Sequence, residues 1–364
     1  MINRRMIRFL LLLLAGIVLL GPFASGEKSI LLTFTGDCTI GCDEKYRREE
    51  DSFASVIARE GIAYPFERFR FLFDRDDCTV INLEGVLTDS VSEEDKSKTY
   101  RFRGDTSFAA ILTEASVEAC SLANNHIKDF GGQGLRNTQQ TLTDNNIGWF
   151  WLMEPYIFEK DGIRIAFFSV DESSYRTVSE KLRKKMLQMK ADGEVNAIVV
   201  CVHSGREYTA AHYPMQEKHG KVLTDYGADL VITNHPHVVQ GLLIANNRTV
   251  CYSLGNFVFG GNSRIKSVSY RNRLLTSQYS LVVQARLDFS DDGVYLGQQV
   301  TLYPAFTSDD PVDNHYQPYP VLGKDAAAVM DAAQYDTQFT LPDIQATDDY
   351  SFVEMPYLSA EPDT

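Results

Sequence analysis

The chain has 364 residues, of which 44% are hydrophobic and 23% charged, an ordinary composition for a globular protein with a large core. Its 35 basic and 49 acidic residues give a formal net charge of −14. The sequence contains no basic stripe or basic arm, so binding to nucleic acid is not expected. Length alone allows one large domain or two small ones.

The first 26 residues have the order of a secretory signal. Arginines at positions 4, 5 and 8 precede an apolar run over residues 9–20, and small residues follow at 24–26. The run is short for a membrane-spanning helix, but an uncleaved N-terminal anchor stays open as an alternative. We therefore predict an exported protein, secreted or anchored to the outer face of the cytoplasmic membrane. Residues 1–26 are the signal peptide or anchor, 27–323 the main domain and 324–364 an acidic C-terminal tail.

Two predicted strands in the first quarter of the chain end in carboxylates. A β-branched run over residues 30–35 ends at Gly36-Asp37, and a second run over residues 78–83 leads directly into Glu84. Asn82 and Glu84 are two residues apart, so both face the same side of a strand. A buried strand rarely ends in a carboxylate without a partner or a metal. For Asp37, a local turn that uses its side chain is an equally good interpretation.

Two further predicted strands end in amides, a carboxylate and imidazoles. Residues 117–122 form one strand, and Asn124, Asn125, His126 and Asp129 follow it. The alternative to a binding site here is a turn rich in asparagine. The apolar strand over 197–202 ends at His203, shortly before Glu207 and Tyr208.

The segment around which the other motifs are arranged is residues 227–240. Its apolar run at 230–232 predicts a buried strand, and His235-Pro236-His237 follows. Alternate imidazoles point the same way on an extended backbone, and Pro236 biases His235 toward that geometry. The alternative is a pair of unrelated loop histidines.

Turn signals and charge organise the rest of the chain. Lys160-Asp161-Gly162, Asn246-Asn247 and Asp291-Asp292-Gly293 each separate two apolar runs, which predicts three hairpins. After Lys324 the chain has no lysine or arginine. We expect one helix over residues 326–335 in this acidic tail and loose order beyond it. Most of the six cysteines lie in or beside strand-like runs and are interpreted as small buried hydrophobic residues.

The carboxylates, amides and imidazoles all follow predicted strands, which places them together at the carboxyl edge of an α/β sheet. Mixed oxygen and nitrogen ligands suit one or two divalent ions, with Mn, Fe or Zn as the expected metals. Such a centre activates water for a displacement reaction. The sequence therefore predicts a metal site.

The same motifs resemble the CapA family of poly-γ-glutamate capsule biosynthesis proteins, within the calcineurin-like metallophosphoesterase superfamily. The resemblance covers roughly residues 30–259, in the expected order. The matching segments are Thr35-Gly36-Asp37, Asn82-Leu83-Glu84-Gly85, Leu122 to His126 with Asp129 and Gly131, His203 with Gly205, Glu207 and Tyr208, Gly227 to Ile232 with His235-Pro236-His237 and Gln240, and Tyr252 to Phe257.

The resemblance implies an α/β fold, a four-layer α-β-β-α sandwich in which helices flank two sheets. It implies the following metal ligands: Asp37, Glu84, Asn125, His203, His235 and His237. His126 would be the acid or transition-state stabiliser, and Asp129 would orient it. Residues that contact substrate or support the ligands would be Asn82, Asn124, Glu207, Tyr208 and Asn256.

Three positions depart from the family pattern. The superfamily usually has Asp-x-His in its first motif, whereas here Cys38-Thr39 follows Asp37, so one nitrogen ligand is missing. Ser204 stands where an aromatic residue is common, and Thr233-Asn234 replaces a frequent Gly-His. The first change leaves open a single metal, or a second one held weakly.

Two functions follow from this sequence. The first is an exported hydrolase that uses metal-activated water to cleave a phosphoester, or an amide in an anionic polymer of the capsule or cell envelope. The alternative is a non-catalytic, membrane-associated subunit of a capsule-synthesis complex that makes or exports poly-γ-glutamate. The negative net charge does not favour binding of a polyanion unless a local patch or a metal intervenes.

Overall fold

The computed structural model describes residues 28–270 and 273–360. The predicted signal or anchor lies outside these residues. Within the described ranges, no helix combines the length and the apolar character that crossing a membrane requires.

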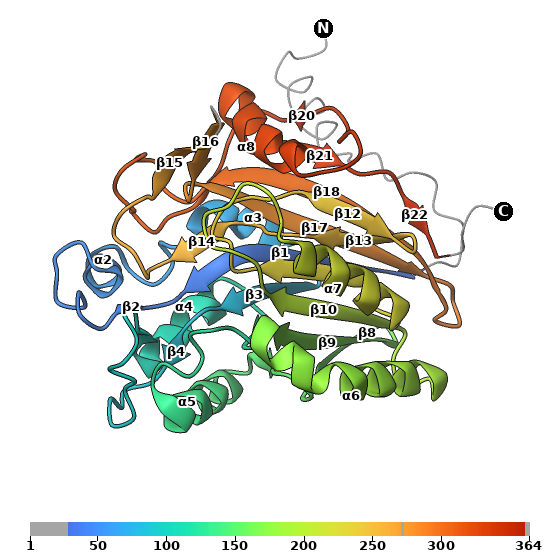
Figure 1. The fold of residues 1–364 in the computed structure, drawn as a ribbon, viewed down its shortest axis with the longest axis horizontal. Helices are drawn as coiled ribbons and strands as arrows, with labels where there is room; N and C mark the ends of the chain where they lie inside the picture. The colour runs from blue at the N-terminus through green and yellow to red at the C-terminus, as the bar shows by residue number, and fades with distance from the viewer. Residues whose placement is uncertain (1–27, 271–272, 361–364) are drawn as a thin grey trace, which may run out of the picture.

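The larger of two main sheets has 11 strands and contains both ends of the described chain (Figure 1). Its central strand β1 pairs in parallel with β3 and β14 and antiparallel with β17. The strands of this sheet are β1 (Lys28–Thr39), β3 (Cys78–Leu83), β6 (Ala119–Ser121), β7 (Gly148–Phe150), β14 (Asn256–Phe259), β17 (Tyr279–Phe289), β18 (Tyr295–Phe306), β19 (Tyr319–Pro320), β20 (Gln345–Ala346), β21 (Ser351–Glu354) and β22 (Leu358–Ser359).

The second main sheet has six strands, in the order β12-β13-β11-β10-β9-β8. These are β8 (Tyr156–Lys160), β9 (Ile163–Asp171), β10 (Ala197–His203), β11 (Leu230–Asn234), β12 (Leu242–Ala245) and β13 (Arg248–Cys251). Two small sheets accompany them, made of β2 (Cys42–Asp43), β4 (Val86–Leu87) and β5 (Phe102–Gly104), and of β15 (Ser267–Tyr270) and β16 (Arg273–Thr276).

Helices α6 and α7 pack on the face of the six-stranded sheet that points away from the larger sheet, as the ribbon in Figure 1 shows. The helices are α2 (Phe53–Glu60), α3 (Arg70–Phe73), α4 (Ala109–Glu114), α5 (Gly131–Asp144), α6 (Glu172–Ala191), α7 (Pro214–Asp225) and α8 (Gly323–Tyr335), with short 3-10 turns η1 (Glu67–Phe69) and η2 (Thr106–Phe108). This content confirms the mixed α/β class.

Strand β10 shows how the layers are built. Side chains alternate across a strand, and Val199 belongs to the apolar cluster shared with β1 and β17 of the larger sheet. Its neighbours Ile198 and Val200 pack instead in the cluster that contains Leu182 of α6 and Leu223 of α7. Because both faces of β10 are buried, its sequence is continuously apolar rather than alternating.

The hairpin predictions are confirmed, and the prediction for the end of the chain is partly wrong. The turns at 160–162, 246–247 and 291–293 join β8 to β9, β12 to β13 and β17 to β18. Helix α8 forms as expected, but the described chain beyond it, through residue 360, contributes strands to the larger sheet. Strand β21 pairs with β18, and Val353 and Met355 are buried in the main core. The acidic composition of the segment gave no indication of these apolar contacts.

Candidate metal centre

The predicted ligands converge because parallel strands present their carboxyl ends at one edge. Asp37 of β1 lies opposite Asn82 of β3 and Asn256 of β14. Gly36 makes this approach possible, since a Cβ on it would lie 2.2 Å from the carbonyl oxygen of Gly255. The second sheet contributes His203 at the end of β10, which pairs in parallel with β11. The site is thus assembled from both main sheets.

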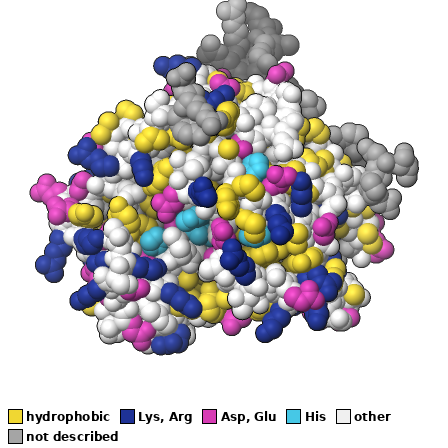
Figure 2. Space-filling view, in the orientation of Figure 1, with side chains coloured by type: hydrophobic (Ala, Val, Ile, Leu, Met, Phe, Trp, Pro, Cys, Tyr) yellow, Lys and Arg dark blue, Asp and Glu magenta, His cyan; other side chains and the backbone are white. Residues whose placement is uncertain are grey.

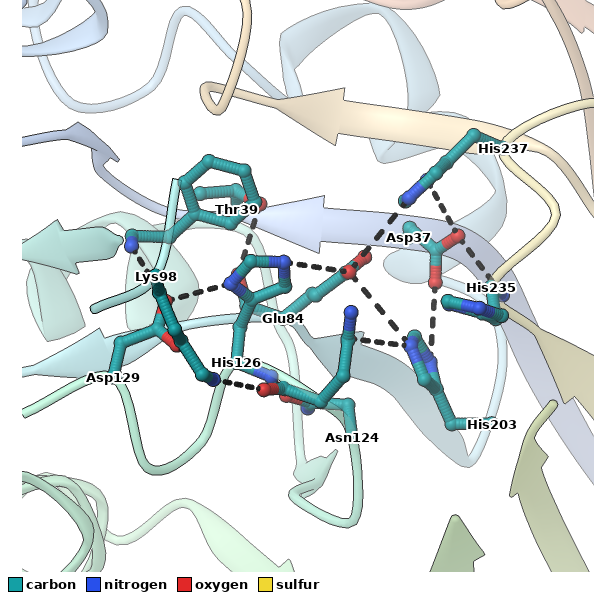
Figure 3. Close-up of polar contacts among 12 residues, drawn as sticks. Asp37, Thr39, Glu84, Lys98, Asn124, His126, Asp129, His203, His235 and His237 are labelled. Atoms are coloured by element: carbon teal, nitrogen blue, oxygen red, sulfur yellow. Dashed lines mark hydrogen bonds and ion pairs between the residues drawn. The ribbon is translucent and has the colours of Figure 1, made fainter. Parts of the chain in front are cut away.

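The Glu84 carboxylate lies at the centre of this cluster (Figure 3). Its Oε1 is 3.7 Å from Nε2 of His203 and 3.8 Å from Nε2 of both His126 and His237. The side chain is fully buried, and neither carboxylate oxygen has a hydrogen-bond partner among the described residues. A buried carboxylate without a donor is costly. A proton or a bound cation would offset this cost.

Asp37 is held in place by its neighbours. Its Oδ1 accepts a hydrogen bond from Nδ2 of Asn82 (2.8 Å), and its Oδ2 accepts one from the backbone N–H of His235 (3.2 Å). Nδ1 of His237 lies 3.2 Å from the same Oδ2. Asp37 therefore connects the two sheets at the base of the cluster.

The three imidazoles that follow β10 and β11 differ in their partners. Nε2 of His203 contacts Oδ1 of Asn125 at 2.9 Å, and Nδ1 of His237 contacts Oδ1 of Asn256 at 2.8 Å. The ring of His235 lies 4.6 Å from that of His203, and its buried Nδ1 has no hydrogen-bond partner among the described residues. His235 thus has a buried nitrogen available for a ligand.

The backbone at these histidines is not extended, so that prediction is wrong. His235 has φ 111° and His237 has φ 57°, values that a residue with a side chain rarely adopts. The carbonyl oxygen of Pro236, between them, accepts a hydrogen bond from the backbone N–H of Tyr208. The two rings still come within 5.9 Å of each other. A strained turn fixed by tertiary contacts produces this convergence.

The pKa values of the three imidazoles are shifted in two directions. Burial lowers the pKa of His203 well below its usual value, and the neighbouring His235 and His237 lower it further. Burial and His237 also lower the pKa of His235. Burial acts to lower the pKa of His237 as well, but the carboxylates of Glu84 and Asp37 raise it to about 10. Burial raises the pKa of Glu84 well above its usual value.

His126 sits beside the cluster in a chain of polar contacts. Its Nδ1 lies 2.6 Å from Oδ2 of the fully buried Asp129, and Oδ1 of Asp129 accepts a hydrogen bond from Lys98 at 2.6 Å. Nζ of Lys98 also donates to the carbonyl oxygen of Asn125. The ring of Phe102 stacks on His126 with centroids 4.1 Å apart.

Lys98 and Phe102 were missed in the sequence. The segment 90–98 has the polar composition of an exposed loop, and nothing local indicates that it folds over His126. The contact depends on long-range hydrogen bonds, such as the one from the backbone N–H of Asp95 to the carbonyl oxygen of Asp129.

The residues predicted to support the ligands take different positions. Asn82 and Asn256 contact Asp37 and His237, as described above. Asn124 turns toward the backbone: its side chain donates to the carbonyl oxygen of Leu83 and accepts from the N–H of His126. Glu207 is exposed, and one of its oxygens lies within 4.8 Å of His235 and His237 nitrogens. The ring of Tyr208 lies 5.7 Å from that of His237.

The residues present fit a divalent cation. Three overlapping groups of side chains bring ligand atoms within 4.8 Å of one another, and they are Glu84 with His203 and His235, Asp37 with Glu84 and His237, and Glu207 with His235 and His237. Carboxylate and imidazole donors suit Mn, Fe or Zn. The unpartnered oxygens of Glu84 and the unpartnered Nδ1 of His235 are atoms that a cation would satisfy.

Cys38 and Thr39, which stand where the superfamily has x-His after Asp37, do not replace the missing nitrogen ligand. Burial raises the pKa of the Cys38 thiol to about 12, so this residue is held as a neutral thiol. Thr39 donates its hydroxyl to the carbonyl oxygen of Glu84 at 2.8 Å. It therefore supports the backbone of Glu84 and offers no nitrogen.

Fold and site together define a mixed α/β protein with a buried carboxylate–imidazole cluster. Residues 31–261 match the family described as bacterial capsule synthesis protein PGA_cap. The chain belongs to this family, and the resemblance drawn from the sequence motifs is confirmed.

Two curated relatives are also named as capsule or PGA biosynthesis proteins. The chain is 24% identical over 257 residues to the capsule biosynthesis protein CapA of Bacillus anthracis, covering 64% of this chain and 60% of that protein. It is 24% identical over 224 residues to the PGA biosynthesis protein CapA of Bacillus subtilis (strain 168), covering 56% and 59%. The matches thus span about three fifths of these relatives.

Among solved structures, the fold is similar to sulfate thiohydrolase SoxB of Thermus thermophilus. The TM-score is 0.41 and the sequence identity 12%, over 89% of this chain and 64% of that one.

Proposed function

We propose that this chain is an exported, metal-dependent hydrolase that acts on poly-γ-glutamate or another anionic polymer of the capsule or cell envelope. One observation carries the proposal, namely the buried Glu84 carboxylate, which lacks a hydrogen-bond partner among the described residues and faces three imidazoles. The names of the relatives support capsular polyglutamate as the setting. The predicted four-layer α-β-β-α sandwich and kinship with metallophosphoesterases belong to the same proposal.

The ligands proposed for one or two ions are Asp37, Glu84, Asn125, His203, His235 and His237. A bound divalent ion would supply an activated water and neutralise developing negative charge. The low pKa of His203 and His235 keeps these imidazoles neutral, which is the form that binds metal.

His126 is the proposed general acid. Asp129 accepts the hydrogen of Nδ1, which orients the ring and directs Nε2 toward the cluster. In hydrolysis, water adds to the carbonyl carbon or phosphorus and the bond to the leaving group breaks. Nε2 of His126 gives its proton to the leaving nitrogen or oxygen, and the proton released by the added water restores the ring by way of solvent. The ammonium group of Lys98 donates a hydrogen bond to Asp129 and stabilises its negative charge during this step.

The test is metal content and hydrolysis by the full chain. Elemental analysis should find one or two transition ions, and a His235→Ala, His237→Ala double variant should lose them. The purified protein is then assayed on poly-γ-glutamate and on a phosphodiester, bis(p-nitrophenyl) phosphate, with and without Mn²⁺. Full activity in the double variant would contradict the proposal.

The second candidate function is a non-catalytic subunit for polymer synthesis or export. The observation that favours it is that the relatives are named for biosynthesis rather than degradation. In this case the chain binds no metal after reconstitution with Mn, Fe or Zn. It should instead be recovered with membrane proteins of the capsule-synthesis machinery after crosslinking in cells.

A further inference from the structure

A cavity of about 260 Å³ lies beside the candidate metal centre, and tyrosines form much of its wall. Its lining includes Arg206, Tyr208, Tyr213 and Tyr335. Tyr208 borders the candidate metal centre as well, because its ring lies 5.7 Å from that of His237. The cavity thus continues the site along the surface. We call it the tyrosine cavity.

Each of these three tyrosines carries a cation on its ring. Nζ of Lys266 lies 3.5 Å from the centroid of Tyr208, and the guanidinium carbon of Arg206 lies 4.6 Å from that of Tyr213. The guanidinium carbon of Arg273 lies 4.3 Å from the centroid of Tyr335. Stacking on an aromatic face positions a cation without neutralising it.

The three cations have no anionic partner within the part of the chain that the structure describes: none of them forms an ion pair with a carboxylate there. Two acidic side chains near the cavity, Asp336 and Glu217, contact His212 in its wall instead. One oxygen of Glu207 lies within 4.8 Å of nitrogens of His235 and His237. On a chain with a net charge of −14, three unneutralised cations around one cavity form a local positive patch.

Three segments that are distant in sequence build this patch. Arg206, Tyr208 and Tyr213 come from the loop after β10. Lys266 directly precedes β15, Arg273 begins β16, and Tyr335 ends α8. Figure 1 shows the β15–β16 hairpin next to α8, and Figure 2 shows Lys and Arg side chains around the histidines on this face. Tyr208 has φ 54°, an uncommon backbone conformation that the hydrogen bond to Pro236 holds.

We propose that the tyrosine cavity with Arg206, Lys266 and Arg273 is a binding subsite for the carboxylates of a linear polyanion, which leads the polymer to the metal centre. The proposal rests on the proposed function for its substrate class. Guanidinium groups pair with carboxylates through two parallel hydrogen bonds, and the lysine adds a point charge. The tyrosine rings provide flat apolar surface for the methylene groups between carboxylates.

The test measures binding separately from hydrolysis. A fluorescein-labelled decamer of γ-linked glutamate is titrated with the full chain, and anisotropy is recorded. The triple variant Arg206→Gln, Lys266→Gln, Arg273→Gln should bind at least about tenfold more weakly. The matched control is Lys181→Gln, Arg183→Gln, Lys184→Gln on α6, which removes the same charge and should change the affinity less than about twofold.

Equal weakening by the two triple variants would overturn the proposal, because it would indicate a non-specific charge effect. Equally tight binding of a γ-glutamine decamer would also overturn it, and so would tighter binding of polyphosphate of the same charge. A protein that binds the decamer but hydrolyses nothing refutes the proposed function and leaves the subsite standing.

Discussion

The ammonium group of Lys98 lies 2.6 Å from Oδ1 of Asp129, whose carboxylate is fully buried. The other oxygen of Asp129 accepts hydrogen bonds from Nδ1 of His126 and from the backbone N–H of Phe102. A single carboxylate therefore joins a distant loop to the proposed general acid. Lys98 compensates the charge that Asp129 carries inside the protein.

We expect Lys98→Met to destabilise the fold by about 1–2 kcal/mol, less than for a fully buried pair because the Lys98 side chain is 34% exposed. Lys98→Arg retains the charge and should recover part of this loss. Urea unfolding measures both. Lys96→Met is the control, since Lys96 is 82% exposed, and it should change stability by less than about 0.5 kcal/mol. A Lys98→Met protein as stable as the wild type would show that the contact carries no energy.

Replacement of Glu84 by glutamine should have different effects in the absence and presence of metal. The metal-free variant should lose little stability, because Glu84→Gln removes a buried carboxylate with no hydrogen-bond partner among the described residues, which offsets the loss of its attraction to His237. Mn²⁺ at about 100 times its Kd should stabilise the wild type by about 2.7 kcal/mol and should not stabilise the variant.

Thermal unfolding with and without Mn²⁺ measures this difference. Glu114→Gln, at a carboxylate that is 48% exposed, is the control and should keep the full response to the metal. Stabilisation of the Glu84→Gln variant as large as that of the wild type would place the ion elsewhere.

The site residues at the strand ends could be predicted from the sequence because the pattern that marks them lies within a few neighbouring residues. An apolar run followed by a carboxylate or imidazole marks Asp37, Glu84 and His203. Parallel pairing of β1 with β3 brings the two carboxylates together, and the packing of the second sheet adds His203. The conformation of His235 was predicted incorrectly because it depends on a hydrogen bond between Tyr208 and Pro236, which are 28 positions apart. Local preference before a proline was overridden by this tertiary contact.

The loop around Lys98 and the C-terminal tail show a second limit. Both segments are polar or acidic, so their composition indicates exposure. Their few inward side chains, such as Val353 on β21, become buried only when another strand, here β18, pairs with the segment. Composition averaged over a segment cannot identify such contacts.

The pair formed by His212 and Asp336 should make stability depend on pH. Burial lowers the pKa of His212, but hydrogen bonds and charge from Asp336 and Glu217 raise it overall above its usual 6.5. A raised pKa means that the folded state binds the proton more tightly than the unfolded chain. The stabilisation is therefore complete below the unfolded pKa of 6.5 and is lost as pH rises through the folded value.

Asp336→Asn should accordingly lower the free energy of unfolding by about 1 kcal/mol at pH 5.5 and by less at pH 9. The cost at pH 5.5 is modest because solvent partly screens the imidazole. Urea unfolding across this pH range measures the difference. His315→Asn is the control, because the side chains of the His315–Asp309 pair are 50% and 60% exposed, and it should change the free energy of unfolding by less than about 0.5 kcal/mol. A cost for Asp336→Asn that is the same at both pH values would contradict the linkage.

The C-terminal segment beyond α8 should contribute to stability as a part of the core. Met355 is 4% exposed, packs in the apolar cluster shared by the two main sheets, and donates its backbone N–H to the carbonyl oxygen of Val300. Met355→Ala should lower the free energy of unfolding by about 2–4 kcal/mol, because it leaves a cavity among atoms that cannot fully relax. Ile344→Ala lies in the same acidic segment at a side chain that is 39% exposed, and it should cost less than about 1 kcal/mol. Chemical unfolding of both variants compares a core position with a surface position at similar composition. Equal small effects would mean that the segment is a dispensable tail, whereas the expected difference makes it part of the domain that carries the metal centre.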